Sequence, residues 1–173
     1  MLNKSGYIVS LVICFLMIAF WAFFLFGCIH FYSQFGALEY QDIVHEELTF
    51  ERYEVKRRLK GGDRYFIYVQ EYTNSFEITG IAQRKLDKSA LEKLESGTSV
   101  EIYYDVGCSI CEMKSGSDTL LSLSDYKEVN QNNQKAGIIL CPIMIASVLF
   151  LILIFSRMYL PSYKSDRKRK QKN

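Results

Sequence analysis

Two of the five cysteines form a C-x-x-C pair, Cys108-Ser109-Ile110-Cys111. This spacing is typical of thioredoxin-like active sites, in which one thiolate attacks a disulfide and the second thiol completes the exchange. Such a site needs a helix N-terminus that lowers the pKa of the attacking thiol. The EMKSGSD segment that follows here has no helical pattern, and the loop lacks both the facing proline and the βαβ order of that fold. A catalytic dithiol is therefore the least favoured interpretation of the pair.

Two other interpretations of Cys108 and Cys111 stay open, a structural disulfide and two inert thiols. If residues 108–114 are extended, side chains at i and i+3 point to opposite faces, so a disulfide requires a turn between them. Export of this loop would favour oxidation of the thiols. A lone C-x-x-C without a second pair or a nearby histidine is a poor zinc site. We therefore predict no metal and no cofactor.

The other residues that could carry acid–base chemistry do not converge. His30 follows an apolar run and His45 lies in an acidic stretch, so each is most simply a polar surface residue. Glu46 and Glu47 are neighbours on a predicted strand and face opposite ways, which prevents them from acting as a paired acid and base. The sequence contains no G-x-S-x-G, P-loop or H-E-x-x-H motif. These observations predict that the protein is not an enzyme.

The candidate residues lie mostly between two uncharged apolar runs, residues 6–29 and 136–155. The chain of 173 residues is 49% apolar and 23% charged, and nearly every charge lies between or after the runs. This segregation excludes a disordered chain and a simple soluble globule. A helix of 24 residues reaches about 36 Å, enough for a hydrocarbon core of about 30 Å. We predict transmembrane helices over residues 6–33 and 136–156, with Pro142 tolerated in the second turn of the latter.

The first apolar run has two alternative interpretations. A cleaved signal peptide is less favoured because the run exceeds the usual apolar length of roughly 7–15 residues and no clean cleavage site follows it. Leu25-Phe26-Gly27-Cys28 resembles a bacterial lipidation motif, with Phe26 in place of the usual small or aliphatic residue. The second apolar run already anchors the chain, so lipidation of Cys28 is also less favoured.

The flanking charges predict the orientation of the helices. Residues 157–173 carry seven basic residues and one acidic residue, a net charge of +6. By the positive-inside rule, residues 1–5 and 157–173 are then cytoplasmic, and residues 34–135 form a loop outside.

The basic tail is also a candidate contact for anionic lipid headgroups, each basic residue near such a surface contributing about 1 kcal/mol. The residues concerned are Arg167, Lys168, Arg169, Lys170 and Lys172. A nuclear signal or a nucleic-acid contact is the other interpretation of such a run. We favour lipid because the run adjoins an apolar span. The outer loop carries a net charge of −5, which gives it no general attraction for nucleic acid.

The loop of residues 34–135 has the pattern of a small antiparallel β domain. Alternating apolar residues predict strands over 47–59, 64–72 and 76–80, with a turn at 60–63 between the first two. In the first strand Leu48, Phe50, Arg52 and Val55 alternate with charged neighbours, and in the second Tyr65, Ile67 and Val69 share one face while Phe66, Tyr68 and Gln70 share the other. Val100 and Ile102, in a later strand, are expected to face inward. Helical spacing predicts a short helix over 86–95, capped by Asp87 and ended by Gly97.

Three further strands complete the predicted domain. They cover residues 98–105, 108–114 and 119–123, and a short polar helix over 125–134 leads into the second apolar run. We expect an α+β membrane protein with two transmembrane helices flanking a sheet of five to six strands. Such a sheet closes as a partly open barrel or as a sandwich.

The stretch Leu94-Glu95-Ser96-Gly97-Thr98-Ser99-Val100-Glu101-Ile102-Tyr103-Tyr104-Asp105, between two apolar spans, resembles the DUF3592-type membrane proteins of bacteria. The resemblance covers the whole arrangement of two spans around a β-rich domain. It implies a location in the bacterial plasma membrane. It implies little chemistry, since the family is largely uncharacterised.

The apolar runs also carry small residues at a spacing that lets helices approach closely. Gly6, Ser10 and Cys14 recur every four residues, and Gly137 and Cys141 repeat the interval. Packing of the two spans against each other is favoured over packing against an unidentified membrane or envelope protein.

Together these features predict a non-enzymatic two-pass membrane protein whose exported β domain mediates protein interaction or envelope sensing. A small accessory subunit of a membrane complex is one alternative. A membrane-tethered thiol protein acting through Cys108 and Cys111 is the other.

Overall fold

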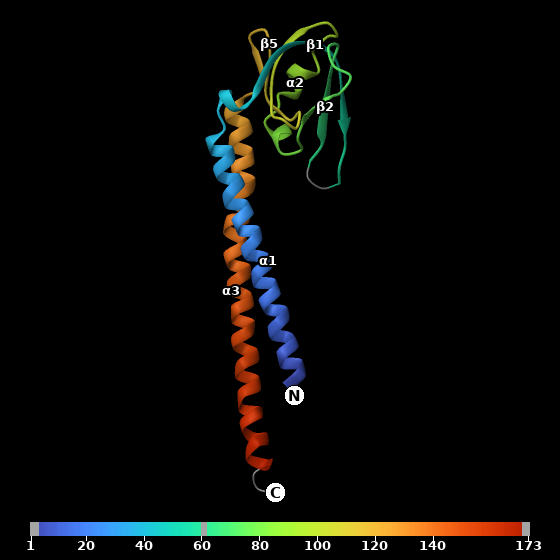
Figure 1. Ribbon diagram of the computed structural model, residues 1–173. Helices are drawn as coiled ribbons and strands as arrows, with labels where there is room; N and C mark the ends of the chain where they lie inside the picture. The colour runs from blue at the N-terminus through green and yellow to red at the C-terminus, as the bar shows by residue number, and fades with distance from the viewer. Residues whose placement is uncertain (1–3, 60–61, 171–173) are drawn as a thin grey trace. The chain divides into compact units, whose positions relative to one another are not determined.

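The computed structural model describes residues 4–59 and 62–170, and the chain separates into two compact units (Figure 1). The first unit is helical and comprises Met1–His30 with Lys135–Asn173. The second, Phe31–Gln134, contains the sheet.

Two long helices, α1 (Lys4–Ala37) and α3 (Leu123–Lys170), contain the apolar runs. Their segments Gly6–Ala37 and Leu123–Met158 are long and apolar enough to cross a membrane. In their most apolar windows only 6% and 11% of the residues are buried. The core helix of a soluble protein would be mostly buried, so an apolar surface this open indicates a membrane protein. The polar segment 125–134 belongs to α3 itself, because no proline or glycine interrupts the helix between Leu123 and Lys135.

Six antiparallel strands form one open sheet in the order β3-β2-β1-β4-β5-β6. The strands are β1 (Val44–Lys56), β2 (Arg64–Val69), β3 (Phe76–Ile78), β4 (Ser99–Tyr104), β5 (Ile110–Ser115) and β6 (Asp118–Leu121). This sheet, with its short helix and the two flanking apolar helices, confirms the predicted fold class.

Strand β1 holds the sheet together because its two halves have different partners. Val44–Thr49 pairs with β4, and the half from Phe50 to Lys56 pairs with β2. The sheet also curls: Glu77 of β3 forms a single parallel bridge to Ser109, just before β5, and its N–H donates to the carbonyl of Cys108 at 2.9 Å. The strands curl around the short helix α2 (Figure 1).

The inner face of the sheet is filled largely as the alternation predicts. The residues of the alternating pattern that are buried are Leu48, Phe50, Tyr65, Ile67, Val69, Val100 and Ile102. Arg52 and Val55, which the predicted alternation groups with Leu48 and Phe50, do not follow them into the core, and both are exposed. A β-bulge between Phe50 and Arg52 adds one residue to β1 and shifts the alternation, so that Tyr53 packs against the core instead.

The predicted helix over 86–95 is a single α-helical turn, α2 (Lys88–Leu91), preceded by the 3₁₀ helix η2 (Ala82–Arg84). The Asp87 side chain accepts from the N–H of Ala90 at 3.0 Å, which confirms its capping role. The helix is shorter than predicted because the N–H groups of Lys93 and Leu94 bond three residues back rather than four. Gly97, at φ +92°, then turns the chain into β4.

Candidate functional site: the Glu112 network and the cysteine turn

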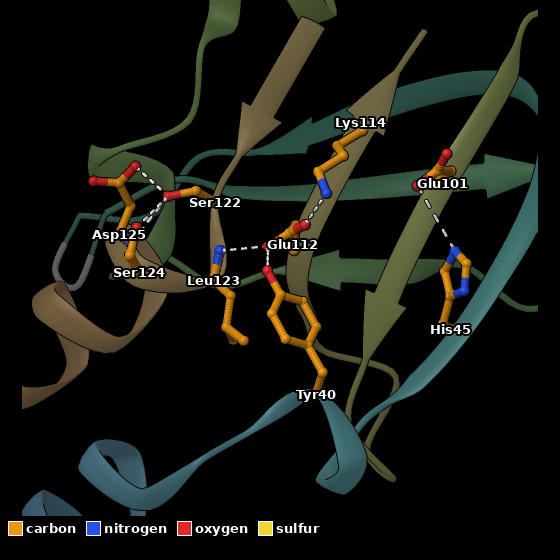
Figure 2. Close-up of polar contacts among 9 residues, drawn as sticks. All are labelled: Tyr40, His45, Glu101, Glu112, Lys114, Ser122, Leu123, Ser124 and Asp125. Atoms are coloured by element: carbon orange, nitrogen blue, oxygen red, sulfur yellow. Dashed lines mark hydrogen bonds and ion pairs between the residues drawn. The ribbon is translucent and has the colours of Figure 1, made fainter. Parts of the chain in front are cut away.

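A buried carboxylate, Glu112 of β5, lies at the centre of the best-developed polar network in the sheet unit (Figure 2). Its side chain is 2% exposed. Its Oε2 accepts from the Tyr40 hydroxyl at 2.8 Å and from the Leu123 N–H at 2.9 Å. Its Oε1 forms an ion pair with Lys114 Nζ at 2.5 Å. Glu112 therefore has a partner on each carboxylate oxygen.

The partners of Glu112 come from three different elements. Tyr40 opens the 3₁₀ helix η1 (Tyr40–Asp42), which follows closely after α1, and Leu123 is the first residue of α3. Lys114 is two residues along β5 and lies on the same face as Glu112. The network thus joins the sheet to the chain just beyond α1 and to the first turn of α3.

Burial alone would raise the pKa of Glu112, but the donors outweigh it. The ion pair with Lys114 and the hydrogen bonds from Leu123 and Tyr40 hold the pKa of this carboxyl below its ordinary value. The same contacts raise the pKa of Lys114, mainly through its bond to Glu112, and raise the pKa of Tyr40 for the same reason. At neutral pH Glu112 is therefore ionised, Lys114 is protonated and Tyr40 is neutral. Such fixed protonation states suit a structural contact better than proton transfer.

The start of α3 is stabilised by a second set of contacts (Figure 2). Ser122 Oγ accepts from the Asp125 N–H at 3.1 Å and donates to Asp125 Oδ2 at 2.6 Å. Ser122 therefore acts as the helix N-cap, and the negative charges of Glu112 and Asp125 lie at the positive end of the helix. Acidic and hydroxyl side chains fix where α3 begins.

An aromatic surface adjoins the Glu112 network. The Tyr103 ring stacks on His45 with centroids 4.2 Å apart and contacts Tyr40 edge-on at 5.4 Å. Lys114 Nζ lies 5.4 Å from the Tyr103 centroid, and His45 Nε2 is 3.8 Å from an oxygen of Glu101. The side chains of His45 and Glu101 are about half exposed, so this surface faces solvent.

Glu46 and Glu47 lie on opposite faces of β1 and do not form a pair. Glu46 accepts from the hydroxyls of Tyr104 at 2.7 Å and Tyr72 at 2.9 Å. Glu47 accepts from the Ser99 hydroxyl at 2.6 Å. These donors explain both carboxylates as structural hydrogen-bond acceptors.

The cysteine pair lies at a turn before β5. Cys108 adopts φ +59°, and its N–H donates to the Asp105 carbonyl at 2.9 Å. The Asp105 side chain accepts from the N–H groups of Gly107 and Ser109, both at 2.9 Å. The turn that a Cys108–Cys111 bridge would require is therefore present. All five cysteines are free thiols in this structure, so the disulfide stays a prediction.

Burial determines the chemistry of Cys111, whose side chain is fully enclosed. Desolvation, with a contribution from the charge of Asp105, raises the pKa of the Cys111 thiol to about 12. A thiol that stays protonated at neutral pH is a weak nucleophile. The environment of Cys111 therefore favours a packing role over a catalytic one.

In the helical unit, α1 and α3 pack on each other through small and apolar side chains. Cys14, Cys28, Cys141 and Val148 are buried in that unit. A Cβ added to Gly137 would lie 2.4 Å from the Sγ of Cys28, so the glycine allows a close approach.

The remaining candidates of the helical unit have local contacts. Ser10 Oγ donates to the Gly6 carbonyl of its own helix at 2.9 Å, and both residues are half-buried. Tyr7 Oη and Ser156 Oγ lie 3.1 Å apart. The early residue Tyr7 thus meets the late residue Ser156, and Cys28 meets Gly137, so the two helices are antiparallel.

The basic tail is only partly described. The backbone of α3 continues helically through Arg167, Lys168, Arg169 and Lys170, whose side chains lie outside the described part, and Lys172 lies outside it entirely. The contact with lipid headgroups stays a prediction.

No group of three or more His, Cys, Asp or Glu residues is placed to hold a metal ion within the described part of the chain. A cavity of about 410 Å³ lies in the sheet unit, and Asp42, Asp105, Cys111 and Tyr126 line part of it. Both of these carboxylates accept backbone hydrogen bonds, Asp105 from Gly107 and Ser109 and Asp42 from Glu39.

Sequence reasoning missed Glu112 and its partners. One signal was available: Glu112 and Lys114 are two residues apart on a predicted strand and therefore share a face. The contributions of Tyr40 and Leu123 depend on how distant segments fold together, which no local pattern contains.

Comparison with known proteins adds no relative. No family model matches the chain, and neither curated proteins nor solved structures include a match.

Proposed function

We propose that this is a non-enzymatic two-pass membrane protein of the bacterial plasma membrane, whose β domain lies outside and binds a protein partner or senses a signal there. The observation that carries the proposal is the Glu112 network. It connects a solvent-facing aromatic surface to the first N–H of an apolar helix that could cross the membrane.

A buried ion pair contributes specificity of arrangement more than stability, since its desolvation offsets much of the Coulombic attraction. In the Glu112–Lys114 pair the carboxylate is buried and the ammonium group is partly exposed, and Tyr40 belongs both to the network and to the exposed aromatic surface. A partner that displaces Tyr40 would remove a donor from Glu112 and so perturb the start of α3. This is the route by which binding on the surface would reach the helix.

The surface itself has the composition of a protein-binding site. Tyrosine side chains are enriched at interfaces because they offer a large apolar area and a polar tip. Tyr40, Tyr103 and His45 present three rings, with the charges of Glu101 and Lys114 beside them. We name these five residues the Tyr103 surface.

The interaction is tested with a photo-crosslinking amino acid placed at His45 in living cells, and at Asp118, the exposed first residue of β6, as the matched control. We expect a discrete crosslinked protein from position 45 and none from position 118. Loss of that product in a Tyr103→Ala background would assign it to the Tyr103 surface. No product from position 45, or equal products from both positions, would overturn the proposal.

The orientation is tested with engineered cysteines in a Cys108→Ser background and a membrane-impermeant maleimide. Val106 is 98% exposed, so Val106→Cys should react in intact cells, whereas Ser165→Cys in the basic tail should react only after permeabilisation. The reverse pattern would place the β domain in the cytoplasm.

A further inference from the structure

The end of the β1–β2 hairpin, residues 55–64, concentrates the positive charge of the β domain. These ten residues include five basic residues and one acidic residue, a net charge of +4. The rest of the 34–135 segment carries eight basic and seventeen acidic residues, a net charge of −9. A domain that is acidic elsewhere therefore presents one strongly cationic segment, which we name the cationic hairpin.

In the described parts of the cationic hairpin, residues 55–59 and 62–64, the contacts leave two arginines available. Arg64 pairs with Glu77 at 2.9 Å, and Lys56 Nζ lies 4.4 Å from the centroid of the Phe66 ring. Arg57 and Arg58 are exposed, and neither has an ion pair with any residue that the structure describes. Two adjacent guanidinium groups are thus free to meet an external anion.

An apolar side chain accompanies these cations. Leu59 is fully exposed immediately after Arg58, and Val55 is exposed on the same hairpin. Arginine with an exposed leucine at a turn matches an interface that offers both anionic headgroups and an apolar interior. An acidic protein surface would account for the arginines but leaves the fully exposed Leu59 without a role.

Short connections tether the β domain to both long apolar helices. Only six residues, 38–43, separate the end of α1 from the start of β1, and one residue separates β6 from α3. If α1 and α3 cross the bilayer, such short connections keep the β domain at a high effective concentration near the headgroups. Even a modest affinity would then suffice for contact.

We propose that the cationic hairpin docks on anionic lipid headgroups, with Arg57 and Arg58 at the phosphates and Leu59 inserted between them. This goes beyond the Tyr103 surface, which is built from other residues. It does not depend on which side of the membrane the domain occupies.

The test uses the full chain with a single tryptophan reporter. Trp21 is the one tryptophan in the sequence, so Trp21→Phe with Leu59→Trp places the reporter at the hairpin. The protein is reconstituted in nanodiscs of zwitterionic lipid, with or without added phosphatidylglycerol, and with brominated acyl chains as quencher. We expect a shift of emission to shorter wavelength and a loss of intensity in the anionic discs, and neither in the zwitterionic discs.

Two matched variants keep the outcome interpretable. Val106→Trp in the same background places the reporter at another highly exposed apolar position and should respond to neither disc. Arg57→Glu with Arg58→Glu should abolish the response of the Leu59→Trp reporter, while circular dichroism shows the fold retained, because these side chains lie outside the core.

Three results would overturn the proposal. The reporter at position 59 could show no response, or it could respond equally in both discs, or the reporter at position 106 could respond as well. A response to soluble polyglutamate without a response to anionic discs would instead assign the hairpin to an acidic protein.

Discussion

The helical unit and the sheet unit place their apolar side chains in opposite directions. In α1, Phe15, Phe23 and Phe26 are exposed, and the small residues Cys14 and Cys28 are buried. In the sheet, Ile67, Ile78 and Ile102 are fully enclosed, and the charged residues lie outside apart from the buried Glu112. Each arrangement suits a different solvent, since lipid accepts apolar surface that water does not. The contrast shows that this one chain is built for both.

The largest effect that would test this contrast is expected in the sheet core. Ile102→Ala should lower the free energy of unfolding by about 2–5 kcal/mol, because it leaves a cavity among enclosed side chains. Ile13→Ala, at an exposed position of α1, should change it little. Thermal unfolding of the full chain in mild detergent measures both. Equal losses from the two variants would mean that the exposed face of α1 is covered by protein rather than lipid.

A second variant tests the packing of the two long helices. Gly137→Leu forces a side chain into the space occupied by Cys28 and should cost about 1–3 kcal/mol. Gly27→Leu is the matched control, because a Cβ added there has no neighbouring atom within 4 Å. Denaturation monitored by helical circular dichroism compares them. If the two glycines tolerate leucine equally well, the α1–α3 contact does not depend on Gly137.

A third variant tests the charge of Glu112. Since the folded-state pKa is depressed below the ordinary value of 4.5, the ionised group contributes stability above that pH. The contribution is lost as the pH falls through the folded-state pKa. Glu112→Gln should therefore be less stable than the parent by about 1–3 kcal/mol at pH 7, and the difference should narrow in acid.

Melting temperatures measured from neutral to acidic pH follow this difference. Glu95→Gln, at an exposed position without a described side-chain bond, serves as the control and should track the parent. A Glu112→Gln variant as stable as the parent at pH 7 would show that the Glu112 network does not need the charge.

The smallest effect is expected at the cap of the short helix α2. Asp87→Ala removes the cap of α2, whose single turn holds Leu91 in the core. We expect a slight fall in the melting temperature, and a smaller one for Asp87→Asn, which retains an acceptor oxygen. An unchanged melting temperature in Asp87→Ala would show that burial of Leu91 alone holds the turn.

Much of this architecture could be predicted because it depends on local periodicity. The alternation placed Tyr65, Ile67 and Val69 on one face of a strand, and the structure buries all three. The uncharged runs likewise indicated the two long apolar helices. In both cases the signal lies within a few neighbouring residues.

The features that could not be predicted depend on pairing between distant segments. The bulge that turns Arg52 outward arises where β1 changes its partner from β4 to β2. Glu112 lies at the centre of a buried network only because Tyr40 and Leu123, from the two ends of the domain, both donate hydrogen bonds to it. Neither depends on the residues beside it in the sequence.

The divided pairing of β1 has a consequence for biosynthesis. As the chain is made from its N-terminus, the second half of β1 can pair with β2 as soon as Val69 has emerged. The first half, which includes Leu48, must wait for Ser99–Tyr104. Over that interval the nascent chain carries an open strand edge, the kind of surface that chaperones bind and that aggregation exploits. Translation speed between Val69 and Tyr104 therefore sets how long the protein is most vulnerable to misassembly.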